Sequence, residues 1–269
     1  MNVKIAGLFL AALPIFAYQA AQPQGNQPQG NQPQANQPKI SDAQRQALMK
    51  LQTDSQAQKW SDVLTDANGI IENFPDSPYK QNVLYIAFQA AGNSNSYDQL
   101  VVWGDRIIQA NPNDVFARVQ LADAMADHIR ENDLDKDQSV QKVNDYAHQA
   151  LNVLQNATAP PANLPMDPSQ WPAMKQDLTN RAYYALGVAA DVKKNYADAQ
   201  KNFNLAVQSD PTNNFFLTRL LRSYMENKQY DDAIAAAQKA LDNPASTPAV
   251  KETAEKAKQQ ATTLKSSAK

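Results

Sequence analysis

The sequence contains no cysteine and little glycine. Of its 269 residues, none is Cys and seven are Gly. Without cysteine the chain forms no disulfide and cannot carry the lipid-bearing cysteine of bacterial lipoproteins. So few glycines leave little material for a glycine-rich phosphate loop. Lys and Arg total 25 against 27 Asp and Glu. Because no basic excess is available to neutralise phosphates, we expect no nucleic-acid partner.

The sequence also lacks the motifs of common catalytic sites. It contains no Gly-x-Ser-x-Gly, no His-Glu-x-x-His and no P-loop sequence. The two histidines, His128 and His148, would lie on different helices, and no further ligands for a metal accompany them. We therefore predict a non-catalytic protein with no catalytic residues and no cofactor.

One acidic segment resembles the opening of an EF-hand calcium loop. Asp133, Asp135 and Asp137 alternate as the first ligands of such a loop do. The loop also needs a glycine at its sharp turn and a glutamate at its last position, where this chain has Gln138 and Asn144. We therefore predict no metal site and interpret the segment as an acidic loop that caps the next helix. Calcium-dependent binding is the alternative.

The N-terminus has the pattern of a secretory signal. Basic Lys4 precedes an uncharged stretch, Ile5–Ala17, which is too short to span a bilayer comfortably. We predict a signal peptide over residues 1–21, so that the protein is exported and is periplasmic or secreted. Tyr18 and Gln19 stand where a cleavage site prefers small residues. The alternative is an uncleaved anchor in the inner membrane, which would be the chain's one membrane contact.

A linker follows the predicted signal. Residues 22–39 are rich in Gln, Pro and Asn, and a proline recurs at every fifth position from Pro23 to Pro38. Since this segment has nothing apolar to bury, we predict that it is disordered. The folded domain is then predicted over residues 40–269.

A period of 34 residues runs through the second half of the chain. A fixed period of this size indicates stacked units of two helices each. The recurring pairs are Leu186 and Leu220, Lys194 and Lys228, Tyr196 and Tyr230, Asp198 and Asp232, Ala199 and Ala233, Ala206 and Ala240, and Val207 and Leu241.

These residues resemble the tetratricopeptide repeat (TPR) family. The segment reads Tyr183-x-x-Leu186-Gly187, then Tyr196-x-x-Ala199-x-x-x-Phe203-x-x-Ala206, and closes on Asp210-Pro211. Small residues allow two antiparallel helices to approach closely, and the proline cannot continue a helix. The resemblance implies an all-α fold, a right-handed α-solenoid of about five TPR-like helix pairs. An apolar stripe over residues 248–265 predicts a C-terminal helix that caps the open end.

Weaker copies of the unit precede the two strong ones. Ile70-Ile71 returns as Ile107-Ile108, 37 residues later. A further pair is expected from about residue 115, and a Pro-rich insertion over residues 156–172 separates it from the strong repeats. We interpret this insertion as a structured loop.

The TPR resemblance also implies a concave groove, lined by the first helix of each pair, that binds an extended peptide or a helix of a partner protein. We therefore predict a non-catalytic protein–protein interaction adaptor of the bacterial cell envelope. The alternative is a self-assembling structural protein joined through the C-terminal helix. Counting along the matched helices places in the groove Tyr79, Asn82, Ile86, Phe116, Gln120, Asp123, Arg181, Tyr184, Asp191, Phe215, Arg219 and Arg222.

Overall fold

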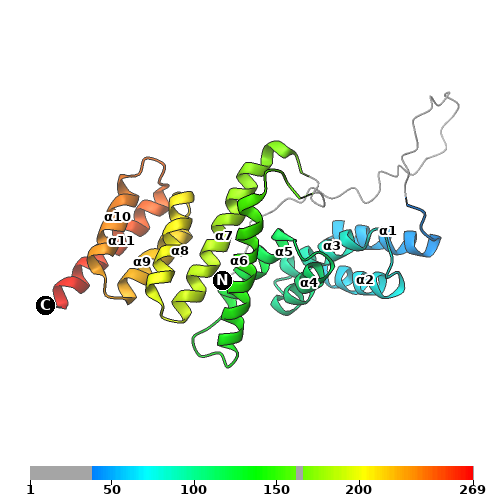
Figure 1. Ribbon diagram of the computed structural model, residues 1–269, viewed down its shortest axis with the longest axis horizontal. Coiled ribbons are helices and arrows are strands. Elements are labelled where there is room, and N and C mark those ends of the chain that lie inside the picture. Colours follow the sequence, from blue (N-terminus) through cyan, green and yellow to red (C-terminus); the bar gives the residue numbers. More distant parts are fainter. Residues whose placement is uncertain (1–37, 162–165, 269) are drawn as a thin grey trace. The chain divides into compact units, whose positions relative to one another are not determined.

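A computed structural model describes residues 38–161 and 166–268, and within them every regular element is helical (Figure 1). The eleven α-helices and one 3-10 helix confirm the predicted all-α class. The predicted signal peptide and most of the predicted linker lie outside the described residues. Within the described part, no helix combines the length and the apolar character that crossing a membrane requires.

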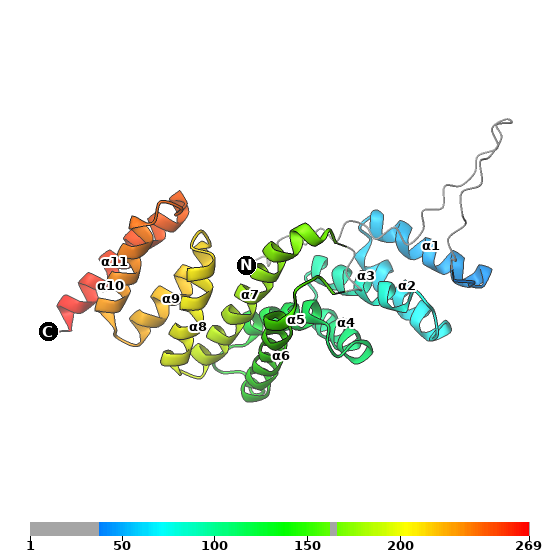
Figure 2. The same cartoon turned by 45° about the horizontal axis from the view of Figure 1, so that its top comes forward.

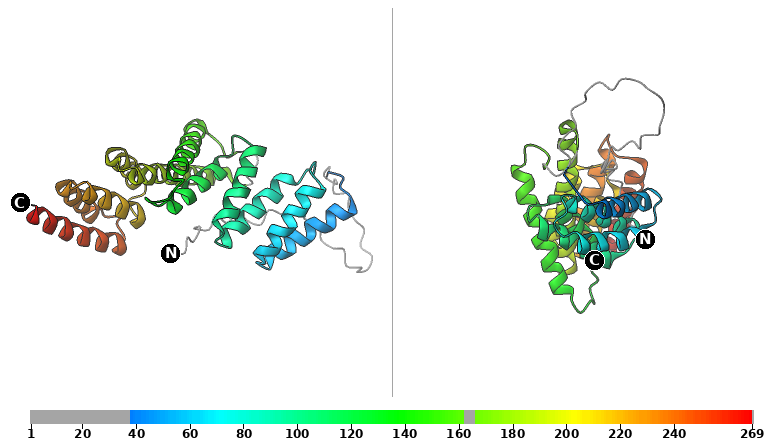
Figure 3. Two further views of the ribbon diagram at one scale, coloured as in Figure 1. Left: turned by 90° about the horizontal axis from the view of Figure 1, so that it is seen from below. Right: turned by 90° about the vertical axis from the view of Figure 1, so that its right-hand side faces the viewer.

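The chain divides into two units, residues 1–112 and 113–269. Unit 1 holds two helix pairs, α1 with α2 and α3 with α4, and each helix contacts the next (Figure 3). Ser41 caps α1, because its side chain accepts a hydrogen bond from the Gln44 amide. The helices are α1 (Asp42–Gln56), α2 (Trp60–Asn73), α3 (Lys80–Asn93) and α4 (Tyr97–Ala110).

Unit 2 holds three helix pairs, α5 with α6, α7 with α8 and α9 with α10, followed by α11. With unit 1 this makes the five pairs and the capping helix that the sequence predicts. The right-handed course of the solenoid stays a prediction. The helices are α5 (Val115–His128), α6 (Lys136–Asn156), α7 (Trp171–Val192), α8 (Tyr196–Ser209), α9 (Asn214–Glu226), α10 (Tyr230–Asp242) and α11 (Pro248–Ser267).

The Pro-rich insertion ends earlier than predicted. A 3-10 helix spans Pro168–Gln170, and α7 begins at Trp171. Trp171 is buried, at 3% exposed, and it is the first residue of α7. Pro172 is tolerated because it stands in the first turn of α7, where its missing N–H would have no helical partner.

Four of the five pairs share one turn between their helices. In each turn one residue has a positive φ, between 55° and 59°. Around Lys228, the Gln229 amide donates to the Tyr224 carbonyl and the Lys228 amide donates to the Met225 carbonyl, which is the Schellman motif. The same two bonds recur in the other three turns. The four residues are Gln58, Asn95, Lys194 and Lys228.

Close contact inside the fourth pair depends on a glycine. Gly187 of α7 faces the Phe203 ring of α8, and a Cβ added at Gly187 would lie 2.5 Å from two ring carbons. Phe203 is fully buried, so the ring has little room to withdraw. The small residue predicted at this contact is therefore required by the packing.

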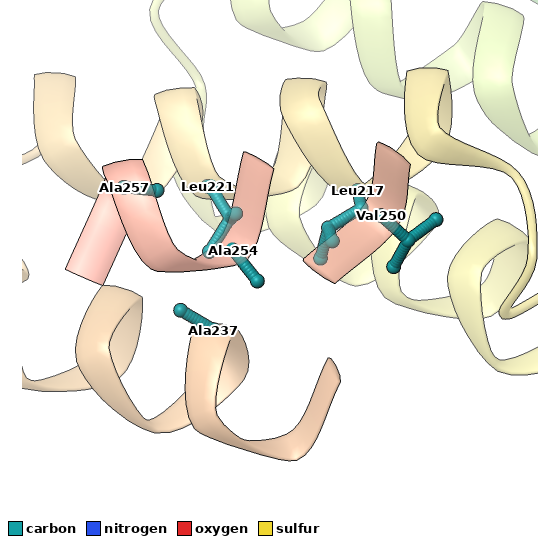
Figure 4. Packing of buried hydrophobic residues seen from close by; sticks show 6 residues of the cluster. All are labelled: Leu217, Leu221, Ala237, Val250, Ala254 and Ala257. Carbon is teal, nitrogen blue, oxygen red and sulfur yellow. The ribbon is translucent and has the colours of Figure 1, made fainter. Parts of the chain in front are cut away.

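The C-terminal helix closes unit 2. Figure 4 shows Val250, Ala254 and Ala257 of α11 packed with Leu217 and Leu221 of α9, and Ala237 of α10 completes the cluster. Val250, Ala254, Ala257 and Ala261 of the predicted stripe are thus buried within the same chain, whereas Leu264 is exposed. Self-assembly through the C-terminal helix stays an alternative prediction.

Candidate partner-binding site

The first helices of the three pairs in unit 2 lie side by side. Helix α7 contacts both α5 and α9, and Figure 2 shows it between them. On each helix, side chains at spacings of four and three residues form one stripe. We name the three stripes together the α5–α7–α9 surface. It comprises Phe116, Gln120, Asp123 and Asp127 on α5, Asp177, Arg181, Tyr184 and Asp191 on α7, and Phe215, Arg219, Arg222 and Glu226 on α9.

An ion pair joins α5 to α7. The Nε and Nη2 atoms of Arg181 donate to Oδ2 of Asp123 at 2.8 and 2.6 Å. The two side chains are 18% and 22% exposed. Because both donors are charged and directed at one oxygen, this contact fixes the two stripes at one register.

A second set of contacts joins all three helices. The Tyr184 hydroxyl donates to Oδ1 of Asp127 at 2.6 Å, and Nη2 of Arg219 lies 3.8 Å from the same oxygen. The Arg219 guanidinium stands 5.5 Å from the centre of the Phe215 ring and 6.0 Å from that of Tyr184. The two rings lie 5.0 Å apart. Asp127, Tyr184 and Arg219 therefore stand at the same level on their helices.

A third group lies toward the C-terminal ends of α7 and α9. Nε of Arg222 donates to Glu226 at 2.6 Å within α9, and both groups act electrostatically on Asp191 of α7. Oδ1 of Asp191 is buried and accepts no hydrogen bond from the described residues. The Ser223 hydroxyl of α9 acts as a donor that lowers the pKa of this carboxyl group, although its geometry at Oδ1 is outside the usual limits for a hydrogen bond. Oδ1 therefore has a weak donor within the chain.

Three carboxyl groups of this surface have raised pKa values. Burial is the largest cause for Asp127, Asp177 and Asp191, and neighbouring carboxylates add to it. Burial and the charge of Asp127 raise the pKa of Tyr184, so its hydroxyl stays a donor. Burial opposes the charge of Arg181, but the nearby carboxylates, Asp123 foremost, outweigh it and raise the pKa of Arg181.

The structure brings together most of the predicted groove residues of unit 2. Asp123 pairs with Arg181, while Tyr184, Phe215 and Arg219 meet around Asp127. Arg222 acts electrostatically on Asp191. Gln120 is half-buried on the α5 stripe. The three predicted residues of unit 1, Tyr79, Asn82 and Ile86, are half-buried at the start of α3 and along it.

Two predicted residues do not have the exposure that a partner contact requires. Phe116 is 5% exposed and Tyr184 is 1% exposed, so both belong to the core. Tyr184 instead packs against Phe203, Phe215 and Phe216 and positions Asp127. An aromatic residue on a helix stripe does not reveal from sequence alone whether the next helix covers it.

Three members of the surface were missed. Asp127 follows Asp123 by four residues, and this spacing places it on the same α5 stripe. Asp177 lies four residues before Arg181 in the first part of α7, which begins at Trp171. Glu226 follows Arg222 by four residues, and that spacing was available in the sequence.

The acidic segment does not assemble into a calcium loop. The described residues contain no group of three or more acidic, histidine or cysteine side chains that could hold a metal ion. Asp133 instead accepts a hydrogen bond from the Arg130 amide, Asp135 from Ser139, and Asp137 from Lys193 of the α7–α8 turn. The three carboxylates therefore face different partners and do not converge.

Comparison with known proteins supports the TPR resemblance. The tetratricopeptide repeat family model matches residues 181–213, so this segment is similar to a TPR. No curated protein matches the sequence.

Similar solved structures include an assembly chaperone of RpL4 (Acl4), with 11% identity, 82% of this chain and 87% of that chain covered, and a TM-score of 0.52. A MamA fragment from Desulfovibrio magneticus RS-1 has 17% identity, 76% and 96% coverage, and a TM-score of 0.49. A thermophilic TPR protein from Thermus thermophilus has 12% identity, 80% and 98% coverage, and a TM-score of 0.47.

Proposed function

We propose, from the similarity of residues 181–213 to a TPR, that this protein is a non-catalytic adaptor of the bacterial cell envelope. It binds a segment of a partner protein on the α5–α7–α9 surface. TPR proteins generally serve as binding scaffolds, and the sequence lacks the catalytic motifs named above. The partner is a protein and not a nucleic acid, because the chain has no basic excess.

One observation carries the binding proposal. The polar side chains of three consecutive first helices form two neighbouring groups, in which Asp123 pairs with Arg181 and Asp127 receives both Tyr184 and Arg219. Side chains already held in place lose little rotamer freedom when a partner binds. Such a surface favours specific binding of a defined segment over nonspecific association.

A blocking experiment tests the proposed surface. Gln120→Trp and Arg222→Trp add bulk on the surface without removing the ion pair of Asp123 or the contacts of Tyr184. Gln141→Trp on the exposed side of α6 is the matched control. We expect that proteins cross-linked in cells to the native chain and to the control are lost from the double variant. If the double variant retains them while its circular dichroism stays native, the partner binds elsewhere and the proposed surface is wrong.

The envelope location rests on residues 1–21, and a separate experiment tests it. We expect the mature protein to lack these residues and to be released with the periplasmic contents or into the medium. An intact N-terminus in the inner-membrane fraction would instead establish the anchored alternative. Recovery of the intact chain from the cytoplasm would refute export.

A further inference from the structure

We propose that the loop between α5 and α6 is a second contact site for a protein partner, in which Leu134 enters an apolar pocket with a basic rim. We name residues 129–135 the α5–α6 loop. This loop lies outside the stripes of the α5–α7–α9 surface, so the inference goes beyond the function proposed for that surface.

The α5–α6 loop departs from the turn that the other four helix pairs share. Those turns have three residues each, at 57–59, 94–96, 193–195 and 227–229, whereas the α5–α6 loop has seven. Figure 1 shows this loop, drawn in green, as the lowest part of unit 2. Repeat proteins accept insertions at such turns because the stacked helices stay unchanged, and inserted loops often carry binding residues.

Contacts with α5 hold the base of the loop in place. Ile129 is 6% exposed, so the first residue of the loop is anchored in the core. Nη1 of Arg130 donates to the carbonyls of Asp127 and His128, at 2.6 and 2.8 Å, at the C-terminal end of α5. The Arg130 amide donates to Oδ2 of Asp133 at 2.7 Å. The course of the loop is therefore fixed where it leaves the helix.

Two ion pairs connect the loop and the start of α6 to the α7–α8 turn. Glu131 pairs with Lys194 at 2.5 Å, and Asp137 pairs with Lys193 at 2.7 Å. Exposed ion pairs each contribute little to stability, but these two lie on both sides of Leu134 in the sequence and limit its movement. A residue on a restrained loop loses less entropy when a partner binds it.

Leu134 is the most exposed large apolar side chain of the described residues. It is fully exposed, at 108% of the reference value, against 55% for Met49, 43% for Val102 and 36% for Leu264. Single exposed apolar residues are common on protein surfaces. The other three lie on helices and are partly covered, whereas the Leu134 side chain contributes nothing to the packing of the fold. Burial in a partner would remove all of its apolar surface from water.

The charges around Leu134 indicate the chemistry of the partner. Asp133 and Asp135 flank it in the sequence, and within the described chain neither forms an ion pair within 4.0 Å. Lys136 acts electrostatically on the two carboxylates that are already paired with lysines. A pocket that receives Leu134 would therefore have cationic groups at its rim, because charge complementarity favours opposite signs across an interface.

The same carboxylates argue against a membrane as the occupant. Membrane surfaces with anionic lipids attract basic segments. Segments that lie on a membrane combine several apolar residues with a basic face, and the α5–α6 loop has neither. A pocket of a protein fits both Leu134 and its neighbours.

A cross-linking experiment tests the site. In the full chain a photo-reactive residue replaces Leu134, and in a matched control it replaces Leu264 of α11. After irradiation of cells, the peptides attached at each position are sequenced by mass spectrometry. We expect position 134 to attach to one defined segment of a partner protein, with apolar residues at the attachment point and Lys or Arg beside them. Position 264 should not attach to that segment.

Three outcomes of this experiment would overturn the inference. Attachment to lipid would show that the loop contacts a membrane. Attachment to a second copy of this chain would show self-association. Attachment to a segment without apolar and basic residues, or no attachment at all, would show that the pocket does not exist.

The protein captured at position 134, once purified, measures the contribution of the leucine. We expect Leu134→Ala to weaken binding at least about tenfold, and its urea-unfolding midpoint to stay native because the side chain is fully exposed. Asp133→Asn/Asp135→Asn should weaken binding and reduce its dependence on salt. Leu264→Ala should bind as the native chain does. Native affinity of Leu134→Ala would refute the inference.

The Gln120→Trp/Arg222→Trp variant separates this inference from the proposed function. If this variant loses its partners while Leu134→Ala keeps native affinity, only the inference fails. If this variant keeps its partners while Leu134→Ala loses them, only the proposed surface fails.

Discussion

Carboxyl groups of the α5–α7–α9 surface with a raised pKa lower the free energy of unfolding when they are ionised. Burial and neighbouring acids raise the pKa of Asp191, so the folded state binds its proton more tightly than the unfolded state does. Ionisation of this group therefore destabilises the fold above the folded-state pKa. The destabilisation is relieved as the pH falls through that pKa toward the ordinary value, about 3.9. We expect the free energy of urea unfolding at neutral pH to be higher for Asp191→Asn than for the native chain. On mild acidification this free energy should increase less in the variant than in the native chain.

Asp54 of unit 1 provides a control of opposite sign. Lys50 and Lys59 lower the pKa of its carboxyl group through hydrogen bonds at 2.8 and 3.1 Å. A lowered pKa contributes stability above the ordinary pKa that is lost as the pH falls through the folded-state value. Asp54→Asn should therefore lower stability at neutral pH. If both substitutions changed the free energy of unfolding in the same direction, the loss of a charge alone would explain the two results.

The turn residue Lys228 gives a second prediction at the scale of one residue. A side chain with a positive φ, here 59°, is strained because its Cβ crowds the backbone, and glycine has no Cβ. We expect Lys228→Gly to raise the free energy of unfolding by about 0.5–1 kcal/mol. Lys201→Gly in the interior of α8 is the matched control and should lower it by about 1 kcal/mol. Destabilisation by both variants would contradict the strain at Lys228.

At the scale of the element, the close contact of α7 with α8 limits the size of the side chain at position 187. Gly187→Ala would place a methyl group against the buried Phe203 ring. We expect it to lower the free energy of unfolding by about 1–3 kcal/mol, as overpacking does. Phe203→Leu should recover part of this loss in the double variant, because the smaller side chain makes room. Urea unfolding of the two single variants and the double variant measures this coupling.

Gly69 of α2 shows the opposite situation. No heavy atom outside the local helix lies within 4 Å of an added Cβ. Gly69→Ala should therefore follow helix propensity and raise stability by up to about 1 kcal/mol. If Gly187→Ala kept the free energy of unfolding of the native chain, close packing would not distinguish the two sites. The same would follow if Gly69→Ala and Gly187→Ala lowered this free energy equally.

The helices could be predicted from sequence because repeat period and small-residue spacing are local properties. The period predicted Gly187 and Ala199 at a close contact, and the apolar stripe of α11 predicted its capping position. The start of α7 could not be predicted, because Pro172 suggested a loop although a first turn accepts proline. The burial of Tyr184 and the pairing of Arg219 with Asp127 depend on the level at which α5, α7 and α9 meet, which spacing within one helix does not determine.

At the scale of the whole molecule, the two units differ in how much apolar surface they can bury. Unit 1 has two helix pairs, whereas unit 2 has three pairs and the α11 cap. Stacked pairs bury their apolar faces on one another, and about three are needed for stability. The α5–α7–α9 surface lies wholly in unit 2, as does every contact described for it.

We therefore expect residues 113–269 to fold alone and to capture the same cross-linked partner proteins in cells as the full chain does. The fragment keeps Asp114, whose side chain caps α5 by accepting a hydrogen bond from the Ala117 amide. Residues 38–112 alone should be far less stable and should not capture these partners. Circular dichroism and urea unfolding test the folding of each fragment, and cross-linking tests binding. If residues 113–269 fold cooperatively but capture none of the partners of the full chain, unit 1 must contribute to recognition.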